Sequence, residues 1–291
     1  MPAPDGLLVV DKPAGWTSHD VVARCRRLCG TRKVGHAGTL DPMATGVLLI
    51  GVGAATRLLG HLALRDKAYT ATIRLGQTTV TDDAEGAVVD HADASGIGDD
   101  AISTAVGDLT GDLEQRPSAV SAIKVDGRRA HQRVRAGEEV VLASRSVRVS
   151  RFGVLEVRRH DAFVDLDVEV ECTTGTYVRA LARDLGAALG VGGHLTALRR
   201  TRVGCYDIAE ARPLDQLEHD LAVVPLATAA ADCFPTYRLD EHEATAVRHG
   251  RALSADLGSA GSVALLTDGG DFLALYEQHG PLAKAVAVFT R

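Results

Sequence analysis

Strict alternation of apolar and polar residues in two stretches constrains the fold of this chain more than any other feature. In residues 162–172 every second residue is apolar, and residues 69–75 repeat the pattern. Because successive side chains of a strand point to opposite faces of a sheet, the alternation predicts two strands with one buried face each. Helical patterns occur elsewhere, and no repeat of 20–50 residues is visible, so we expect an α+β fold and no solenoid.

The first predicted helix begins near Thr17 and ends at Gly30. Thr17 and Asp20 have the spacing of a capping box, and apolar residues follow at helical spacing. Gly30 is placed to end the helix. Shorter patterns predict buried strands at 7–10 and 47–50, helices at 101–109 and after residue 176, and irregular structure over 31–45.

Composition places the chain among ordinary globular proteins, with 46% hydrophobic and 24% charged residues. The longest apolar runs, 6–10 and 46–53, are too short to span a bilayer. The N-terminus also lacks a basic region followed by a long apolar stretch. We therefore expect a cytoplasmic protein with no membrane segment.

The five cysteines are irregularly spaced along the chain. An odd number without a repeated spacing argues against a disulfide framework. Cys25 and Cys29 are four residues apart, but the nearby histidines complete no zinc pattern. We interpret both cysteines as small apolar core residues and expect no metal site.

The net charge of −6 argues against nucleic-acid binding, but the distribution of charge argues differently. Residues 21–36 hold cations and no acid, and residues 124–135 hold five cations against one acid. Many of the acids gather in residues 82–100 instead. Separated basic segments can form a cationic face on an acidic protein. The alternative is a set of solvated helix faces, and charge alone does not choose between the two.

Residues 35–46, GHAGTLDPMATG, have the features of a functional loop. Glycines allow tight turns and the close approach of another molecule. The proline after Asp41 favours an extended backbone at that residue, so its carboxylate can be presented into a cleft. A single Asp-Pro pair is more often a plain turn, so this interpretation depends on the surrounding motifs.

The segment resembles the catalytic motif of the TruB family of pseudouridine synthases, G-H-x-G-x-L-D-P-x-A-T-G. Other motifs of that family are matched in unbroken order over residues 6–205, namely at 6–15, 67–69, 75–86, 115–124 and 175–179. The main departure is Val120, where the family often has an aromatic residue. That difference bears on one local RNA contact.

The resemblance implies a pseudouridine synthase fold, with a bent mixed, largely antiparallel sheet flanked by helices and loops. It places the catalytic domain at 1–230, with a basic RNA-clamping loop at about 114–140. A small, mainly-β, PUA-like RNA-binding domain is expected at 231–291, and the alternative for this region is a structural appendage. The sequence there predicts one helix over 241–249 and a hairpin that turns at 268–270.

The resemblance also implies a reaction, the isomerisation of uridine to pseudouridine at position 55 in the T-loop of tRNA. The N-glycosidic bond to N1 breaks, and the base is rejoined through C5. No redox step is needed, so neither a metal nor another cofactor is implied. The expected partner is the T-arm stem-loop of tRNA, and we expect a monomer without an obligatory protein partner.

Five residues receive roles from the resemblance. Asp41 is the catalytic carboxylate, which either attacks ribose C1′ or deprotonates C2′ on a glycal route. Arg179 is its ion-pair partner. Tyr69 stacks on the target base and assists proton removal from C5, and Tyr177 lines the same pocket. His36 fills the space left when the uridine flips out of its stack.

Phosphate contacts are expected from cations in two segments, because positive charge alone provides much of the affinity for RNA. These cations are Lys12, Lys124, Arg128, Arg129 and Arg133.

Two other functions stay open. One is a guide-RNA-dependent pseudouridine synthase subunit, which shares the Asp motif but works inside a protein complex. The other is a tRNA-folding chaperone that acts by binding alone. A chain without a basic low-complexity tail favours the stand-alone enzyme, and the combination of Asp41, Tyr69 and Arg179 favours catalysis.

Overall fold

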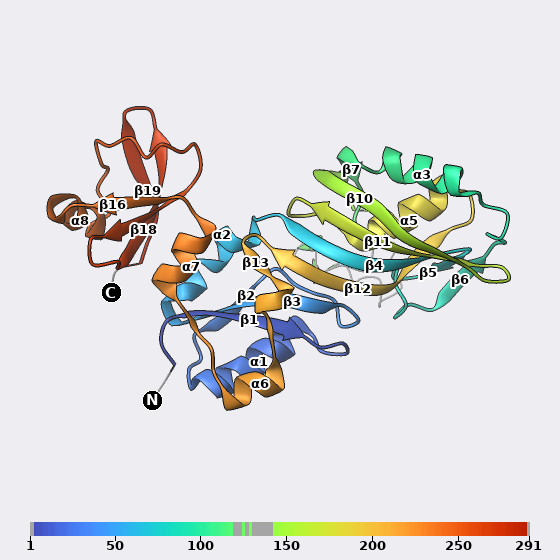
Figure 1. Cartoon of the computed structure of the whole chain (residues 1–291), viewed down its shortest axis with the longest axis horizontal. Helices are drawn as coiled ribbons and strands as arrows, with labels where there is room; N and C mark the ends of the chain where they lie inside the picture. The colour runs from blue at the N-terminus through green and yellow to red at the C-terminus, as the bar shows by residue number, and fades with distance from the viewer. Residues whose placement is uncertain (1–2, 119–123, 126–127, 130–141, 290–291) are drawn as a thin grey trace.

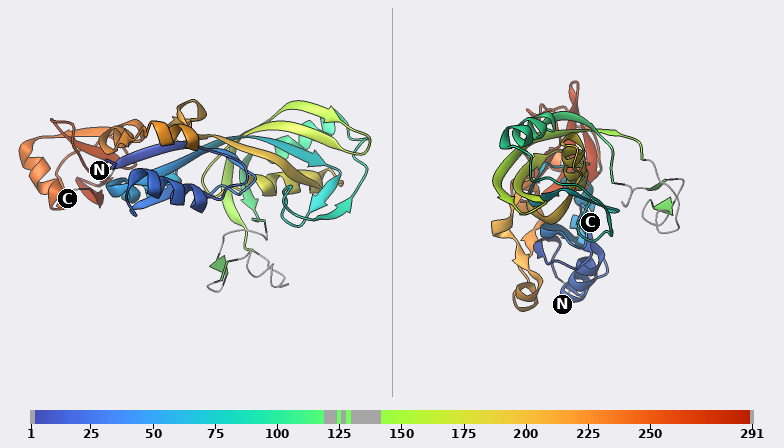
Figure 2. Two further views of the ribbon diagram at one scale, coloured as in Figure 1. Left: turned by 90° about the horizontal axis from the view of Figure 1, so that it is seen from below. Right: turned by 90° about the vertical axis from the view of Figure 1, so that its right-hand side faces the viewer.

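The computed structural model describes residues 3–118, 124–125, 128–129 and 142–289 of the 291-residue chain (Figure 1). One large mixed sheet runs through most of it, and a smaller four-stranded sheet lies at the end of the chain (Figures 1 and 2). The expected α+β class, with a bent, largely antiparallel sheet flanked by helices, is confirmed.

The main path of the large sheet has eight strands, of which only the β14–β1 and β3–β12 pairs are parallel. In spatial order these strands are β14 (Arg212–Pro213), β1 (Gly6–Lys12), β3 (Thr45–Val52), β12 (Gly193–Val203), β4 (Lys67–Leu75), β11 (Val164–Cys172), β10 (Arg145–Arg159) and β7 (Gly111–Gln115). Three short strands pair beside this path, β2 (Val34–Ala37) on β3, β13 (Tyr206–Asp207) on β12, and β15 (Val224–Pro225) on β1.

Helices pack around the large sheet or lead out of it. They are α1 (Ser18–Cys29), α2 (Leu59–Ala63), α3 (Asp99–Asp108), α5 (Val178–Ala188), α6 (Leu214–His219) and α7 (Leu226–Cys233), with 3-10 turns η1 (Gly53–Arg57) and η2 (Ile208–Glu210). Two further strand pairs lie outside the sheet, β5 (Gln77–Thr79) with β6 (Val88–His91) and β8 (Lys124–Val125) with β9 (Arg128–Arg129). The terminal sheet contains β16 (Thr236–Leu239), β17 (Val263–Thr267), β18 (Phe272–His279) and β19 (Leu282–Val288), next to helix α8 (Glu241–Arg248).

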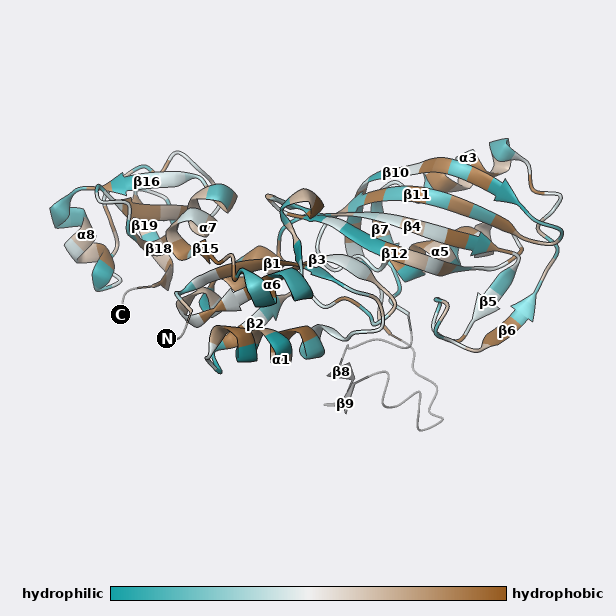
Figure 3. Cartoon of the chain, turned by 60° about the horizontal axis from the view of Figure 1, so that its bottom comes forward, coloured by the Kyte–Doolittle hydropathy of each residue, from teal (hydrophilic) through white to brown (hydrophobic). Residues whose placement is uncertain are grey.

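The two alternating stretches form neighbouring antiparallel strands, as predicted. Strand β4 pairs with β11 along its whole length, from Leu75 opposite Val164 to Lys67 opposite Cys172. The apolar residues of both strands lie in one buried cluster, and Figure 3 shows the alternation along the ribbons. The apolar face of these strands packs against α5 and α3, and this one-sided burial explains the alternation of apolar and polar residues.

Helix α1 has the predicted caps. The Thr17 hydroxyl accepts a hydrogen bond from the Asp20 amide, the Asp20 carboxylate accepts from the Thr17 amide, and Gly30 ends the helix with φ of 61°. Cys25 and Cys29 are buried in the core, as expected. The helix predicted after residue 176 is α5, in which Val178, Leu181, Ala182 and Leu185 are buried and Ala188 is exposed in the last turn.

Part of the segment 31–45, which was expected to be irregular, is a strand, and two further stretches contain short elements that no pattern predicted. Residues 34–37 form β2, an edge strand without alternation that receives its hydrogen bonds from β3. The acidic stretch 76–100 contains the β5–β6 hairpin, and the stretch after residue 207 contains two helices. Short elements of this kind depend on their neighbours rather than on local sequence, so sequence periodicity does not reveal them.

The terminal unit shares a core with the rest of the chain. Phe234, Phe272 and Phe289 pack in one apolar cluster with Leu58 and Leu62 of the first half of the chain. Arg57 donates to the Val288 carbonyl and lies 5.1 Å from the centre of the Phe289 ring. The hairpin β17–β18 and the helix α8 form where they were predicted. The division of the chain at residue 230 stays a prediction.

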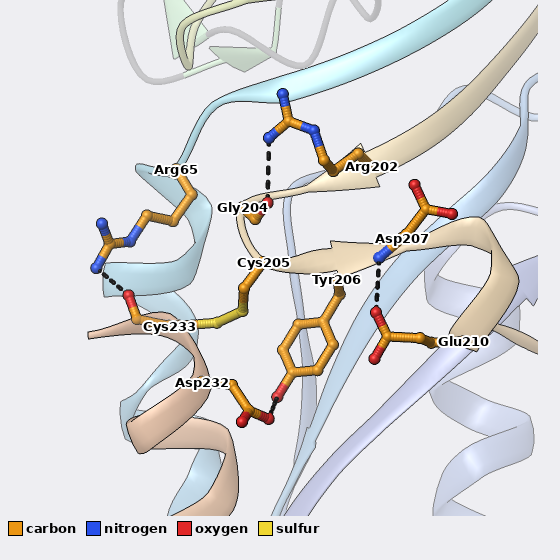
Figure 4. Close-up of a disulfide and its surroundings, with 9 residues drawn as sticks. All are labelled: Arg65, Arg202, Gly204, Cys205, Tyr206, Asp207, Glu210, Asp232 and Cys233. Atoms are coloured by element: carbon orange, nitrogen blue, oxygen red, sulfur yellow. Dashed lines mark hydrogen bonds between the residues drawn. A yellow bond between two sulfur atoms is a disulfide. The ribbon is translucent and has the colours of Figure 1, made fainter. Parts of the chain in front are cut away.

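The irregular spacing of the cysteines indicated no disulfide, yet Cys205 and Cys233 form one (Figure 4). It joins the turn after β12 to the end of α7, across 28 residues of sequence. Arg65 donates to the Cys233 carbonyl at 2.6 Å and stacks on Phe234 at 4.4 Å from the ring centre. One bond is not a framework, and the pairing could not be foreseen because it depends on the position of α7 beside β13.

Reduction of this disulfide is expected to lower the free energy of unfolding by about 3 to 4 kcal/mol, the loop-closure entropy for a separation of this length. Urea unfolding of the oxidised protein with and without reductant measures the change. A Cys205→Ser/Cys233→Ser variant serves as control, because its midpoint should not respond to reductant. Equal midpoints for the oxidised and reduced wild type would contradict the prediction.

Candidate active site

A pocket of about 290 Å³ opens where β2, β4, β12 and the start of α5 meet. Its lining includes Asp41, Tyr69, Tyr177 and Arg179, which the sequence placed together from motifs far apart in the chain. Lys67, Leu198 and Arg200 line it as well, and the remaining lining residues are Gly38, Thr39, Leu40, Ala63, Thr174, Gly175, Thr176 and Val178.

Asp41 lies in the loop between β2 and β3, and contacts with α1 and β1 hold that loop. The Ser18 hydroxyl accepts from the Leu40 amide at 2.9 Å and donates to the Leu40 carbonyl at 3.1 Å. The Gly15 amide donates to the Pro42 carbonyl at 2.8 Å. Because the backbone on both sides is fixed, the Asp41 carboxylate, 38% exposed, is presented at the pocket.

Lys12 is fully buried beneath this loop, which differs from the phosphate contact that was expected. Its ammonium donates to the carbonyls of Pro13, Trp16 and Pro42 at 2.9, 2.6 and 3.2 Å. Burial lowers the pKa of Lys12 to about 8. An ammonium whose three N–H groups all bind carbonyls cannot bind RNA phosphates, so its position fits a brace for the loop.

Two glycines of the motif are required by geometry. Gly38 has φ of 86°, in the left-handed region that side chains disfavour. Gly46, with φ of 100°, packs against the Arg200 backbone, and a Cβ there would lie 2.1 Å from the Arg200 carbonyl oxygen. The motif therefore spaces its glycines where the loop turns and where β3 meets β12.

Arg179 connects Asp41 to a second carboxylate. Its Nε lies 3.0 Å from Asp41 Oδ2, and its Nη1 lies 3.3 Å from Asp83 Oδ2 and donates to the Thr81 carbonyl at 2.8 Å. The Arg179 and Asp83 side chains are only 7% and 3% exposed. Charges this deeply buried interact strongly, so the guanidinium is fixed and Asp41 is oriented by it.

The two tyrosines reach the pocket from different elements. Tyr69, on β4, is 8% exposed, and its pKa is raised chiefly by burial, against the charge of Arg200. Tyr177 precedes α5, and Gln115 holds it by accepting from its amide at 2.8 Å and donating to its carbonyl at 3.1 Å. Tyr177 lines the pocket, and the stacking and proton-transfer roles of Tyr69 stay predictions.

His36 lies on β2, outside the pocket lining but close to it in the chain. Its ring meets the His19 ring edge-on, with centroids 5.7 Å apart. Burial lowers the pKa of His36, and His19 and Arg200 lower it further, so the ring is held neutral at pH 7. A neutral planar ring suits insertion into a base stack, and this role stays a prediction.

The basic loop is only partly covered by the structure. Lys124, Arg128 and Arg129 belong to the short β8–β9 pair, a strand pair where an irregular loop was expected. Arg133 lies outside the described residues. Of the first basic segment, Arg24 forms an ion pair with Glu218 and Arg26 donates to the Val34 carbonyl.

Sequence reasoning missed Lys67, Asp83 and Arg200. Lys67 and Asp83 do fall inside matched motifs, so their positions were visible but their proximity to Asp41 was not. Arg200 lies on β12, a strand that the sequence analysis did not predict. Residues 193–203 mix apolar residues with three arginines and two threonines, so no clear periodicity marks this strand.

No cluster of three or more His, Cys, Asp or Glu side chains suited to a metal occurs within the described part of the chain. In the same residues, every helix is too short or too polar to cross a membrane.

Sequence models of a known family match nearly the whole chain. The TruB family pseudouridylate synthase N-terminal domain matches residues 26–178, the tRNA pseudouridylate synthase B C-terminal domain matches 179–229, and the tRNA pseudouridine synthase II C-terminal domain matches 234–290. Together with the fold and the pocket, these matches define a pseudouridine synthase. The chain belongs to the TruB family, as its motifs indicated.

Curated relatives match the sequence of this chain over almost their full length. A tRNA pseudouridine synthase B of Rhodococcus jostii (strain RHA1) is 61% identical over 97% of this chain and 93% of its own. The protein of the same name from Thermobifida fusca (strain YX) is 57% identical, with 98% of each chain covered.

Two solved complexes contain a chain with the same architecture. A chain of a Cbf5-Nop10-Gar1 complex superposes with a TM-score of 0.74 at 27% identity, over 98% of this chain and 85% of that one. A chain of an H/ACA RNP bound to a substrate RNA gives 0.73 at 26% identity, with the same coverage. The identity to the tRNA enzymes is more than twice as high.

Proposed function

We propose that this chain isomerises uridine to pseudouridine in tRNA, at position 55 of the T-loop. The observation that carries the proposal is the Asp41–Arg179 pair, which opens onto a pocket shared with Tyr69 and Tyr177. The names of the curated relatives support tRNA as the substrate class. The proposed site of action is the cytoplasm.

The reaction moves bonds within one nucleotide. The bond from C1′ to N1 breaks and a bond from C1′ to C5 forms, while C5 loses one hydrogen and N1 gains one. Asp41 acts on the ribose, at C1′ or at C2′, while Arg179 keeps its carboxylate ionised and oriented. Electrons balance within the substrate, so this chemistry requires no redox partner.

Access to the uridine requires that it leave the T-loop stack, at a cost of a few kcal/mol. The pocket volume of about 290 Å³ suits one nucleoside rather than a stacked pair. His36, close to the pocket rim, is the proposed occupant of the vacated space. Tyr69 is proposed to stack on the flipped base and to assist removal of the C5 proton.

Tritium release from C5-labelled uridine tests the proposed reaction directly. The substrate is an unmodified T-arm stem-loop, supplied without guide RNA or any second protein. Release with purified chain supports a stand-alone enzyme that works without a partner. Release only when guide RNA and other proteins are added would identify a guide-dependent subunit, and binding without release would identify a chaperone.

Tyr69→Phe is expected to slow the reaction by about 10² to 10⁴, because it keeps the ring and removes the hydroxyl that takes part in proton transfer. Single-turnover tritium release measures the rate. Tyr69→Leu, which also removes stacking, should be severely impaired. A Tyr69→Phe rate equal to wild type would leave Tyr69 as a stacking residue only.

Changing Arg128, Arg129 and Arg133 together to alanine is expected to weaken tRNA binding and flatten its salt dependence. Each lost phosphate contact lowers the slope of log K against log salt by roughly 0.7 to 0.9. Thermal unfolding of the free protein should change little, because the proposed partners of these cations are RNA phosphates, which the free protein lacks. An unchanged salt slope would move the RNA-binding face to α1, where Arg24, Arg26 and Arg27 become the next variants.

A further inference from the structure

Arg200 is a buried cation in the pocket wall whose role neither the motifs nor the proposed reaction assigns. It is 1% exposed, yet its side chain lines the pocket that holds Asp41 and Tyr69. Its Nε donates to the Val47 carbonyl at 2.7 Å, its Nη1 to Thr39 at 3.4 Å and its Nη2 to Gly38 at 3.2 Å. Backbone carbonyls thus fix the plane of the guanidinium.

The charge itself is not explained by structure alone. Among the residues that the structure describes, no carboxylate forms an ion pair with Arg200. Neighbouring Lys67 and Lys12 are also buried, and Arg200 lowers the pKa of both. A buried cation next to other cations costs stability, and an apolar side chain of similar volume would fill the space at lower cost.

Sheet pairing puts Arg200 beside Tyr69. The two residues are directly opposite each other in the antiparallel β12–β4 pair, so their side chains lie on the same face of the sheet. Burial raises the pKa of Tyr69 and the charge of Arg200 opposes that rise, so the guanidinium lies close enough to the hydroxyl to interact with it. The same guanidinium therefore contacts the loop before Asp41 and shares a sheet face with the Tyr69 side chain.

We propose that Arg200 is a positioning residue that acts through Tyr69. Its guanidinium, fixed by the carbonyls of Gly38, Thr39 and Val47, donates to the Tyr69 oxygen and sets the direction of the hydroxyl in the pocket. Because a guanidinium can only donate, the hydrogen of that hydroxyl must point away from Arg200. The positive charge also stabilises negative charge on that oxygen and opposes the rise in the pKa of Tyr69 that burial causes.

A double-mutant cycle tests this inference, which rests on the proposed isomerisation. Single-turnover tritium release is measured for wild type, Arg200→Met, Tyr69→Phe and the double variant, with RNA prebound. We expect Arg200→Met to slow the reaction by about 10². In the Tyr69→Phe background the same change should cost no more than about threefold, because the hydroxyl on which it acts is already gone.

If Arg200→Met slows tritium release by the same factor in the wild-type and Tyr69→Phe backgrounds, the inference is overturned and Arg200 only braces the sheet. An Arg200→Met rate equal to wild type would overturn it as well. Arg200→Lys, which keeps the charge but not the fork, should recover part of the rate. If Arg200→Met does not fold, the cycle is run with Arg200→Lys, and additivity again counts against the proposal.

Arg202→Met is the matched control. Arg202 lies two residues further along β12, pairs with Glu171 at 2.9 Å and does not line the pocket. Its rate should equal wild type in both backgrounds. Failure of the wild type itself to release tritium would refute the proposed reaction, whereas turnover by wild type with an additive cycle refutes only the role of Arg200.

Discussion

Asp41→Asn is expected to lower turnover by at least about 10⁴-fold, the scale on which removal of a reacting group acts. The amide has the same size as the carboxylate and can still contact Arg179. It has no negative charge, however, and can neither form an ester at C1′ nor remove a proton at C2′. Both open routes therefore predict the same loss in tritium release.

RNA binding should separate from catalysis in this variant. Affinity for a T-arm stem-loop should stay within about tenfold of wild type, because most of it comes from phosphate contacts. Asp112→Asn is a suitable control, since Asp112 also pairs with an arginine, Arg148 at 2.9 Å, but lies outside the pocket. Activity near wild type in purified Asp41→Asn would remove Asp41 from the mechanism.

Arg179→Met is expected to slow single turnover by about 10² to 10³, the usual cost of losing one preorganised charge contact. The change removes the group that orients Asp41. It also leaves Asp83, 3% exposed, without its cation, and breaking a buried pair in this way costs about 3 to 5 kcal/mol of stability. Rate and unfolding free energy should therefore both fall.

A second substitution separates these two effects. Asp83→Asn in the Arg179→Met background removes the stranded charge, so stability should recover while the rate stays low. Arg183→Met is the control on the same helix, because Arg183 pairs with Asp82 and Asp184 away from the pocket. If Arg179→Met kept the wild-type rate, the Asp41–Arg179 contact would be structural only.

Local sequence predicted the elements that carry their own signal. The period-two pattern of β4 and β11, the capping box of α1 and the hairpin β17–β18 all contain the residues that determine them. Strands β2 and β12 have no such local signal. The first is short and half-exposed, and the second has register shifts against β4 that disturb its alternation.

The residues of the site also fall into those that local motifs identified and those whose position depends on the fold. Asp41, Tyr69, Tyr177 and Arg179 were identified through their motifs, and the structure brings all four to one pocket. Lys12 was placed among the phosphate contacts by its charge alone, yet it is buried under the loop. The proximity of Arg200 to Tyr69 depends on strand register, which no single stretch of sequence specifies.

Strand β3 meets β12 at only two register positions, Thr45 with Arg199 and Gly46 with Arg200. The aspartate belongs to the half of the sheet on the β3 side, whereas Tyr69 lies on β4, on the other side of this short seam. The two β3–β12 pairs therefore link the part of the sheet next to Asp41 to the part that carries Tyr69. Substitutions of β12 residues outside the pocket are therefore expected to change the distance between Asp41 and Tyr69 without a direct contact to the substrate. The reaction rate should then depend on how rigidly β3 and β12 are paired.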